Sequence, residues 1–583
     1  MQQFRTLAVL LFLFSTVSFS QIYMVPDGST MVADTLGAQA LPKVAAAPDG
    51  SCYVAWFDNR AKGYAVYIQH LDPKGQPLFP SQGLLVSDHP QETSLSNYDL
   101  KCDKDGNAVI AFMDVRDGEP DIFVYKISPK GEFLWGKDGI KVSKTSGFET
   151  SPKLVITGDG CATVAWSNFT GGSWLMLQRI SPEGKKLWGD DPVYYGANKP
   201  VSPGDQIESF EIPQPVPSDS NSVIVIYNVV TGNFPQQSVR IAAQKFSAKG
   251  EPRWGKGVVS IQGLGHVMPY TPPSVRADGE NGAVIAWHDD RDLDNKQVVY
   301  AQKLNANGSF EFPLNGAEVA SVEGNGYNPV AVRLSVTKEV MVLWKGTDRS
   351  QSESGLFAQI LDEWGNRKLG ESGMGIIPLG QQSIGDYNLT PIGNAAYIGS
   401  VSGNYPNKDG YLQLNLLNSA GMLNWNGASS VAEGSGAKGR LEMVTAPFNS
   451  VIMAFTVALK KGESVWAAKS SFNGNPGGLF SPVNLFDLNA FNMGPEVIIR
   501  WSTNHEEGKW SFRLERRTVD SDWTVVKEVP GTGGFYTVAN YEFVDKAPAD
   551  TRMVYRLIAK SYAGKEIVYD LGQVINTAYP IVK

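Results

Sequence analysis

The chain has 583 residues, which is too long for one ordinary hydrophobic core and predicts two or more domains. It is 42% hydrophobic and contains 60 glycines and 34 prolines, a composition that suits many short strands joined by tight turns. Its formal net charge of −8 argues against a polyanionic partner such as nucleic acid, whose binding depends on lysines and arginines that neutralise phosphates.

The first twenty residues have the pattern of an export signal. Arg5 supplies a positive charge, residues 7–14 are apolar, and Ser18 and Ser20 provide small residues just before Gln21. No later stretch reaches the roughly 20 apolar residues that crossing a bilayer requires. The sequence therefore predicts an exported protein that does not itself span a membrane.

Three cysteines follow the signal: Cys52, Cys102 and Cys161. An odd number precludes a fully paired disulfide framework. A bridge between Cys102 and one of the others is one alternative in an oxidising compartment. The other, which we favour, is that all three are small buried apolar side chains.

A glycine recurs eight times at the end of a strand-like run, at spacings of 53 to 66 residues. The glycines are Gly75, Gly131, Gly184, Gly250, Gly308, Gly365, Gly421 and Gly474. A large apolar residue stands four positions after each of them except the last. Such a fixed period indicates repeated units, each of which leaves a hydrophobic face that only its neighbours can cover.

The second copy shows how one unit is built. Residues 98–103, 108–114, 121–128 and 139–144 are alternating or β-branched runs, and turn residues separate them. Each unit is therefore expected to be four short antiparallel strands. Four-stranded units that repeat around an axis make a β-propeller.

The two ends of the repeat region predict how the ring closes. The eighth copy has three strand-like runs but no fourth, whereas residues 28–34 resemble a fourth strand that precedes the first copy. We therefore expect an all-β chain in which residues 22–478 form an eight-bladed β-propeller closed by an N-terminal strand. A seven-bladed ring is the alternative, because the seventh and eighth copies match the pattern least well.

The period stops after Gly478, and a different pattern begins near residue 485. The run VIIRWS contains Trp501, and the later runs YEFVD and VYRLIAKSYAGKE contain Tyr541 and Tyr555. These motifs resemble a fibronectin type III-like module, a β-sandwich with an early core tryptophan and a late tyrosine corner. The resemblance implies such a sandwich over residues 485–583. Similar modules are common in exported proteins of Bacteroidetes-like bacteria, where they often precede a type IX secretion sorting domain that is not seen here.

One polar signature follows the second strand of several copies. It pairs an aspartate with an arginine two residues later: Asp58 and Arg60, Asp114 and Arg116, and Asp289 and Arg291. All six lie on the same type of loop, so they are predicted to lie on one face of the ring as a candidate ligand-binding rim. The alternative, which we favour, is that each aspartate caps its own turn and each arginine pairs locally.

Two other segments are candidates for a site. The residues from Asp289 to Asp294 include four carboxylates, a candidate Ca²⁺ loop, although a solvated turn is the simpler interpretation. No other cofactor is indicated, because the five histidines lack metal-ligand spacing. The longest irregular segment, residues 196–221, contains Pro213, Pro215 and Pro217 and is where we first expect a partner contact. Residues 207–211 could instead begin a strand.

The turn between the third and fourth strands provides a further comparison. Ser128, Gly131 and Trp135 occupy this turn in the second unit, and similar residues recur in the next two units. The turn loosely resembles the Asp-box of sialidases, but proline or alanine replaces the aspartate. Neither an arginine triad nor the carboxylate pair that glycoside hydrolysis needs can be assigned from the sequence.

Together these observations predict a non-enzymatic protein-binding scaffold of the cell envelope. The resemblance implies a location in the periplasm or on the periplasmic side of the outer membrane, with the cell surface as the alternative. It also implies a protein partner, an outer-membrane export-channel component of the type IX kind, on which the ring would dock. The competing hypothesis is a carbohydrate-binding or sialidase-like glycan-active propeller, with loop aromatic residues such as Tyr270 and Tyr405 stacking on sugars. Two carboxyl groups in a central funnel beside an arginine cluster would favour the enzyme.

Overall fold

The computed structural model describes residues 29–470 and 483–576, apart from short internal segments. These segments are residues 62, 92–96, 144–145, 170–172, 197–207, 233–236, 256–257, 265, 269–270, 405–409, 425–427, 433–435, 448, 460–461, 494–495, 507–509, 519–520, 533–538, 547–550 and 562–565. The expected export signal, Tyr270 and Tyr405 therefore lie outside the described residues. Within the described part, no helix has the length and apolarity needed to cross a membrane.

Up to residue 470, the described residues form eight antiparallel sheets, seven with four strands and one with five. The first four sheets contain β2 (Gln39–Ala46), β3 (Cys52–Ala61), β4 (Gly63–Leu71) and β5 (Leu84–Gln91); β6 (Asp99–Cys102), β7 (Ala108–Asp114), β8 (Asp121–Ile127) and β9 (Ile140–Lys141); β10 (Phe148–Ile156), β11 (Ala162–Phe169), β12 (Ser173–Ile180) and β13 (Val193–Tyr195); and β14 (Glu208–Pro217), β15 (Val223–Thr231), β16 (Ser238–Phe246) and β17 (Val259–Gln262).

The other four sheets follow the same plan. They contain β18 (His266–Val267), β19 (Ser274–Ala277), β20 (Ala283–Asp290), β21 (Val298–Leu304) and β22 (Ala317–Glu318); β23 (Asn325–Arg333), β24 (Val340–Thr347), β25 (Ser354–Leu361) and β26 (Met374–Gly380); β27 (Gln382–Ile392), β28 (Ala395–Asn404), β29 (Tyr411–Asn418) and β30 (Ser429–Ala432); and β31 (Lys438–Ala446), β32 (Ser450–Leu459), β33 (Gly462–Ser470) and β1 (Ser29–Ala33).

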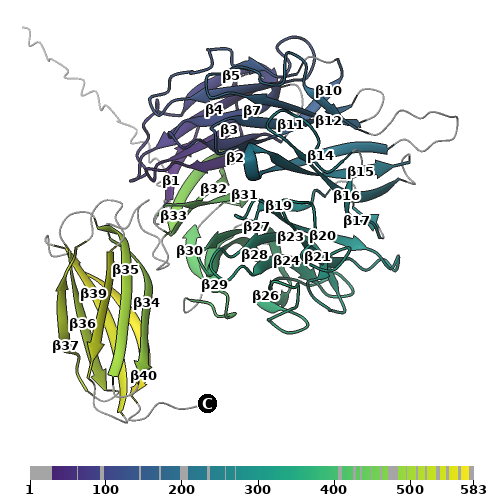
Figure 1. Ribbon diagram of the computed structural model, residues 1–583. Helices are drawn as coiled ribbons and strands as arrows, with labels where there is room; N and C mark the ends of the chain where they lie inside the picture. Colours follow the sequence, from purple (N-terminus) through teal and green to yellow (C-terminus); the bar gives the residue numbers. More distant parts are fainter. Residues whose placement is uncertain are drawn as a thin grey trace, which may run out of the picture.

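The sheets are arranged as a β-propeller (Figure 1). One strand of each sheet contacts the corresponding strand of the next sheet, and the last of them, β31, contacts β2 again. We call these eight strands the inner strands: β2, β6, β10, β14, β19, β23, β27 and β31. The N-terminal strand β1 pairs with β33, with Ser29 opposite Ala468 and Ala33 opposite Val465. The two ends of the repeat region thus meet in one sheet.

The hydrophobic core is divided among the interfaces between neighbouring sheets. Tyr53 and Tyr98 share one buried cluster between the first and second sheets. Another cluster joins the eighth sheet to the first and contains Val32 of β1, Trp56 of β3 and Ile452 of β32. Each sheet is therefore stabilised mainly by its two neighbours, as the repeat pattern predicts.

The structure explains why glycine recurs in every unit. Gly184 has φ +90°, and an added Cβ would lie 2.8 Å from Trp135 of the preceding sheet. The same arrangement places Gly250 on Trp188, Gly308 on Trp254 and Gly365 on Phe312. The periodic glycine of one unit and the periodic apolar residue of the preceding unit therefore form one contact between adjacent units.

Replacing Gly184 by alanine is expected to lower the free energy of unfolding by about 2 to 4 kcal/mol, because it adds a left-handed alanine and a clash with Trp135. Gly189 is a matched control, since it has φ +87° but nothing within 4 Å of an added Cβ. Gly189→Ala should cost only about 1 kcal/mol. Equal urea midpoints for the two variants would contradict the proposed contact.

The three cysteines are unpaired, and Cys52 and Cys161 are buried. Burial raises the pKa of the Cys52 thiol to about 12. These thiols are therefore protonated small apolar groups, and the disulfide alternative is not what the structure shows.

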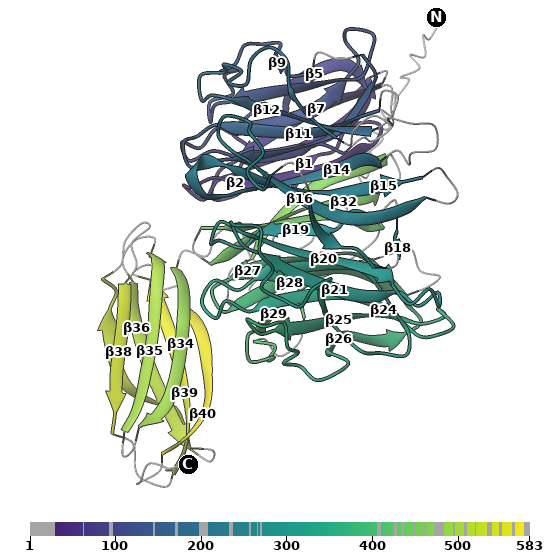
Figure 2. The same cartoon turned by 45° about the vertical axis from the view of Figure 1, so that its right-hand side comes forward.

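Residues 483–576 form a separate body beside the ring (Figures 1 and 2). One sheet contains β34 (Val483–Met493), β35 (Glu496–Glu506) and β38 (Ala539–Asp545); the other contains β37 (Thr524–Pro530), β36 (Trp510–Thr518), β39 (Thr551–Ser561) and β40 (Glu566–Asn576). Trp501 and Tyr541 stack in the core between the sheets, with ring centroids 5.1 Å apart. This β-sandwich has its own core.

Candidate functional site

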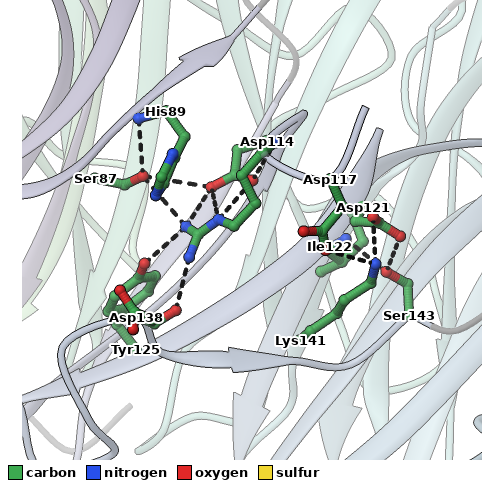
Figure 3. A network of polar contacts seen from close by, with 11 residues as sticks. Ser87, His89, Asp114, Asp117, Asp121, Ile122, Tyr125, Asp138, Lys141 and Ser143 are labelled. Carbon is green, nitrogen blue, oxygen red and sulfur yellow. Dashed lines mark hydrogen bonds and ion pairs between the residues drawn. The ribbon is translucent and has the colours of Figure 1, made fainter. Parts of the chain in front are cut away.

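The aspartate–arginine loops do not form an open rim. Asp58, Asp114 and Asp289 have side chains that are 0% exposed, and each pairs with the arginine two residues later. Arg116 also donates to the Tyr125 hydroxyl at 2.8 Å and to the Asp138 carbonyl at 2.9 Å (Figure 3). The candidate rim is therefore corrected: each carboxylate pairs with its own arginine and also accepts a hydrogen bond from a residue before its sheet, Thr35, Ser87 or Gln262.

The same local arrangement recurs in two other sheets. Arg60 and Arg291 donate to the carbonyls of Gln82 and Asn315, which precede the last strands of their sheets. Their guanidiniums lie over Tyr67 and Tyr300 at 4.0 and 3.2 Å. Each pair thus ties the second strand of its sheet to the third strand and to the turn before the fourth.

Replacing Asp289 by alanine is expected to lower the free energy of unfolding by about 3 kcal/mol, because it leaves the largely buried Arg291 unpaired. The carboxylate also accepts a hydrogen bond from Trp287 Nε1 at 2.9 Å. Asp290→Ala is the control, since Asp290 only accepts backbone amides in its own turn and should cost about 1 kcal/mol. Urea unfolding measures both; equal losses would contradict the burial argument.

The candidate Ca²⁺ loop is also occupied by its own contacts. Asp290 accepts the amides of Asp294 and Asn295 at 3.0 Å each, and Asp294 accepts the amide of Lys296 at 2.9 Å. Across the part of the chain that the structure describes, no three histidine, cysteine or acidic residues are grouped to hold a metal ion. The loop is therefore a turn capped by its own aspartates.

The three prolines proposed as a partner contact lie in a strand. Pro213, Pro215 and Pro217 belong to β14, the inner strand of the fourth sheet, so the loop interpretation is corrected for this part of the segment. An inner strand has one unpaired edge, which is where proline is tolerated in a sheet. Residues 197–207 lie outside the described residues.

The inner strands have a shared irregularity in their centre. In six of them a β-bulge breaks the pairing with the second strand, for example between Ala40 and Lys43 and between Thr150 and Lys153. Leu41, Ser151 and Ile212 in these bulges have φ of +49° to +56°, which is unusual for residues with a side chain. A bulge bends the strand and re-aims the next side chain.

The register places one residue of every sheet at the same level. Lys43, Asp99, Lys153 and Glu442 each lie opposite the alanine that precedes the aromatic residue of the second strand. We call the eight equivalent residues the channel layer: Lys43, Asp99, Lys153, Gln214, Ser274, Val330, Tyr387 and Glu442. Its charged members come from four consecutive sheets, the eighth, first, second and third.

Contacts among the charged members link these sheets. Lys43 Nζ donates to Glu442 Oε1 across the closure of the ring. Lys101 lies two residues after Asp99 and donates to it at 2.8 Å, and the amide of Leu154 in the third sheet donates to Asp99 at 3.0 Å. The carboxylates of the layer are therefore held in defined positions.

Both carboxylates are stabilised as anions. Burial by itself would raise the pKa of Asp99, but the charges of Lys101 and Lys153 outweigh it and lower the pKa. Burial opposes ionisation of Glu442 too, and the Lys43 charge and hydrogen bond lower its pKa. Near neutral pH these groups accept hydrogen bonds and do not act as protonated acids.

Lys153 differs from the other charged members because its ammonium has no hydrogen bond or ion pair with the residues that the structure describes. Its side chain is half-buried. Burial is the largest cause and the charge of Lys43 the next in lowering the pKa of Lys153 from 10.5 to about 8. A group of this kind exchanges a proton close to neutral pH, as general acids and bases do.

A hollow lies on the outer turns between the fourth and fifth sheets. It has a volume of about 620 Å³ and is lined by Lys245, Arg253 and Trp254 among others. Lys245 is already bonded to Asp219 and to the carbonyl of Ala306. Unlike the channel layer, this hollow has no pair of carboxylates that contacts link to neighbouring sheets among its described lining residues.

No family model matches the chain, and no curated protein matches it. Solved structures do match, and the three described next have TM-scores of 0.41 or less. The structure of the Dos1 propeller has 14% identity and a TM-score of 0.41, covering 76% of this chain and 94% of that one. A polysaccharide lyase of the PL25 ulvan lyase group has 11% identity and a TM-score of 0.39, covering 77% and 97%. The GH93 α-L-arabinofuranosidase of Fusarium graminearum has 10% identity and a TM-score of 0.31, covering 55% and 92%.

Most of these matched structures are named as carbohydrate-active enzymes. This finding contradicts the prediction of a non-enzymatic protein-binding scaffold on an export channel. At these identities and TM-scores no substrate or catalytic residue is transferred to the chain.

Proposed function

We propose that this chain is a carbohydrate-active propeller that binds a glycan at the charged side of its channel layer. The observation that carries the proposal is the gathering of Lys43, Asp99, Lys153 and Glu442 at one level of four consecutive inner strands. Carboxylates and ammonium groups that are fixed in place are the hydrogen-bonding partners that sugar hydroxyls require.

The opposite side of the channel layer complements the charged side. Gln214 and Ser274 supply uncharged polar groups, and Tyr387 supplies an aromatic ring that is half-buried. The Tyr387 hydroxyl is fixed by the carbonyl of Asn328 at 2.7 Å. Sites for small polar ligands commonly combine a few converging polar groups with an apolar or aromatic wall.

The two carboxylates and Lys153 also define what chemistry the site supports. Asp99 and Glu442 are ionised near neutral pH, so a two-carboxylate hydrolysis lacks its protonated acid among them. Lys153 is the group whose proton exchanges in this range. We assign proton transfer in any reaction on the glycan to Lys153.

We also propose that the ring has eight blades and that residues 485–583 form a fibronectin type III-like sandwich. Eight consecutive sheets, with β1 completing the eighth, support an eight-bladed ring. The strand orders β34-β35-β38 and β37-β36-β39-β40, with Trp501 in the core and the Tyr555 hydroxyl bonded to Asp545 at 2.7 Å, support a fibronectin type III-like sandwich. An export signal over residues 1–20 supports a glycan encountered outside the cytoplasm.

The proposal is tested with the chain from residue 21 and a panel of neutral and acidic polysaccharides. Binding is measured by calorimetry, and cleavage by the appearance of new reducing ends. We expect binding of at least one glycan, weakened by Lys43→Met and unchanged by Lys130→Met, because Lys130 is an exposed turn residue outside the layer. The proposal is wrong if no glycan in the panel binds.

A further inference from the structure

We infer that the channel layer takes an acidic glycan, whose carboxylate or sulfate group is bound by Lys153. This inference rests on the proposed function and names the class of glycan. It is carried by the unpaired Lys153 ammonium in the layer and by two further cations, Lys101 and Arg276, which lie two residues beyond the layer on their strands.

The charge of this region is opposite to that of the chain as a whole. Four cations, Lys43, Lys101, Lys153 and Arg276, face two carboxylates, Asp99 and Glu442, which gives a local balance of 4 − 2 = +2 in a chain of net charge −8. Overall charge therefore argues against a long polyanion such as nucleic acid, whereas the channel layer together with Lys101 and Arg276 offers a short cationic site.

Two of the four cations are not neutralised by the carboxylates. Lys43 is bonded to Glu442, and Lys101 is bonded to Asp99. Lys153 has neither partner, and Arg276 donates only to the carbonyl of Val275, at 3.2 Å. Arg276 comes from the inner strand of the fifth sheet, and its charge reaches Glu442 across the ring. Its register position is that of Lys101 in the second sheet.

An unpaired ammonium at a half-buried position is unfavourable for folding. An apolar side chain of similar length would fill the same place without the cost of removing a charge from water. The neighbouring residues do not explain why a lysine stands at position 153. Lys43 and Lys101 repel its ammonium, and the two carboxylates, Asp99 and Glu442, are already paired with Lys101 and Lys43. A ligand anion that completes the pairing of Lys153 does explain it.

The uncharged members of the layer identify the ligand as a sugar acid. Gln214, Ser274 and Tyr387 offer amide, hydroxyl and aromatic groups, which suit the hydroxyls and faces of a sugar ring. A uronate carboxylate and a sulfate ester share the oxyanion that Lys153 would bind. Binding experiments with a carboxylated and with a sulfated polysaccharide distinguish a uronate from a sulfate ester.

The probes are oligogalacturonate, which carries carboxylates, sulfated dextran, which carries sulfates, and neutral dextran. We expect wild type to bind one of the acidic probes at least tenfold more tightly than neutral dextran at pH 7. Lys153→Met should lose that tenfold preference, Lys153→Arg should keep it within about threefold, and Lys130→Met should match wild type. Thermal unfolding of each variant checks the fold.

The pH profile separates a binding role from a structural one. The groups that face Lys153 are Lys43 on β2, Asp99 and Lys101 on β6, and Glu442 on β31. Because Lys153 loses its proton as the pH rises through about 8, affinity for the acidic probe should fall several-fold between pH 7 and pH 9. Lys153→Arg should remove this fall, since arginine stays charged.

The lowered pKa of Lys153 determines how Lys153→Met should change the stability of the fold. The folded-state pKa of Lys153 is about 8 against 10.5 for a free lysine, so the cost of the buried charge is greatest below pH 8 and is relieved as the pH rises toward 10.5. Lys153→Met should therefore melt at pH 7 no lower than wild type. A lower melting temperature would show that Lys153 stabilises the fold and would overturn the inference.

The outcomes distinguish the inference from the proposed function. Equal binding of neutral and acidic probes, or full acidic binding by Lys153→Met, overturns the inference and leaves a glycan-binding propeller. Binding of none of the three probes, with binding of another neutral glycan in the panel, overturns the inference alone. Binding of no glycan at all overturns both.

Discussion

Deletion of residues 21–36, which removes strand β1, is expected to destabilise the whole ring by several kcal/mol, a large share of the roughly 5 to 15 kcal/mol that stabilises a domain. Strand β1 provides the fourth strand of the last sheet, and Val32 and Ala33 pack in the cluster that joins the eighth sheet to the first. Its loss exposes the edge of β33 and opens that interface. We expect the melting temperature to fall by more than about 10 °C, or the protein to precipitate.

Deletion of residues 483–583 is the matched control for this experiment. The core of β34–β40 shares no residue with the clusters of the ring, so the truncated ring should melt at the temperature of the full chain. A normal melting temperature after removal of β1 would contradict closure by that strand. A large fall after removal of the sandwich would contradict its independence.

Replacing Asp99 by alanine is expected to have the largest effect of any single substitution in the channel layer. Asp99 is buried, accepts the amide of Leu154 and is the ion-pair partner of Lys101. Without it, Lys101 loses its partner and the excess of positive charge around Lys153 grows, so we expect the free energy of unfolding to fall by about 3 to 4 kcal/mol. Because the pKa of Lys153 is raised by Asp99, its removal should also lower the pH at which acidic glycan binding declines.

Asp99→Asn separates the two roles of this side chain. The asparagine oxygen still accepts the amide of Leu154, so the loss of stability should be smaller than for alanine. The lowered pKa of Asp99 means that its contribution to stability is present above pH 3.8 and is lost as the pH falls through the folded-state pKa. Urea unfolding at pH 7 and pH 3 checks both statements, and identical losses for alanine and asparagine would contradict them.

The propeller and its strands could be predicted because their signals are local and periodic. The turn glycine and the large apolar residue recur because the glycine of each unit meets the apolar residue of the preceding unit across a sheet interface, as Gly184 meets Trp135. The four strands predicted for the second unit correspond to β6–β9. A contact that recurs in every unit produces a sequence pattern that recurs in every unit, so the fold could be predicted from the sequence.

The channel layer could not be predicted in the same way, because its members are unlike one another. Lys43 and Lys153 both follow a proline in equivalent positions, Leu41-Pro42 and Ser151-Pro152, and this was the available signal. Asp99 and Glu442 lack that proline, so only the register of the inner strands shows that all four share one level. The prolines of β14 misled the prediction, because a bulged inner strand with one free edge accepts prolines that normally indicate a loop.

The most direct test of a glycan site in the channel layer is hydrogen exchange measured by mass spectrometry on the chain from residue 21, with and without oligogalacturonate at pH 7. Peptides that cover β2, β6, β10 and β31 should exchange more slowly when the glycan is bound, and peptides of the sandwich strands β34–β40 should be unchanged. Slower exchange in the aspartate–arginine turns or the sandwich alone, with none in these inner strands, would contradict a glycan site in the channel layer.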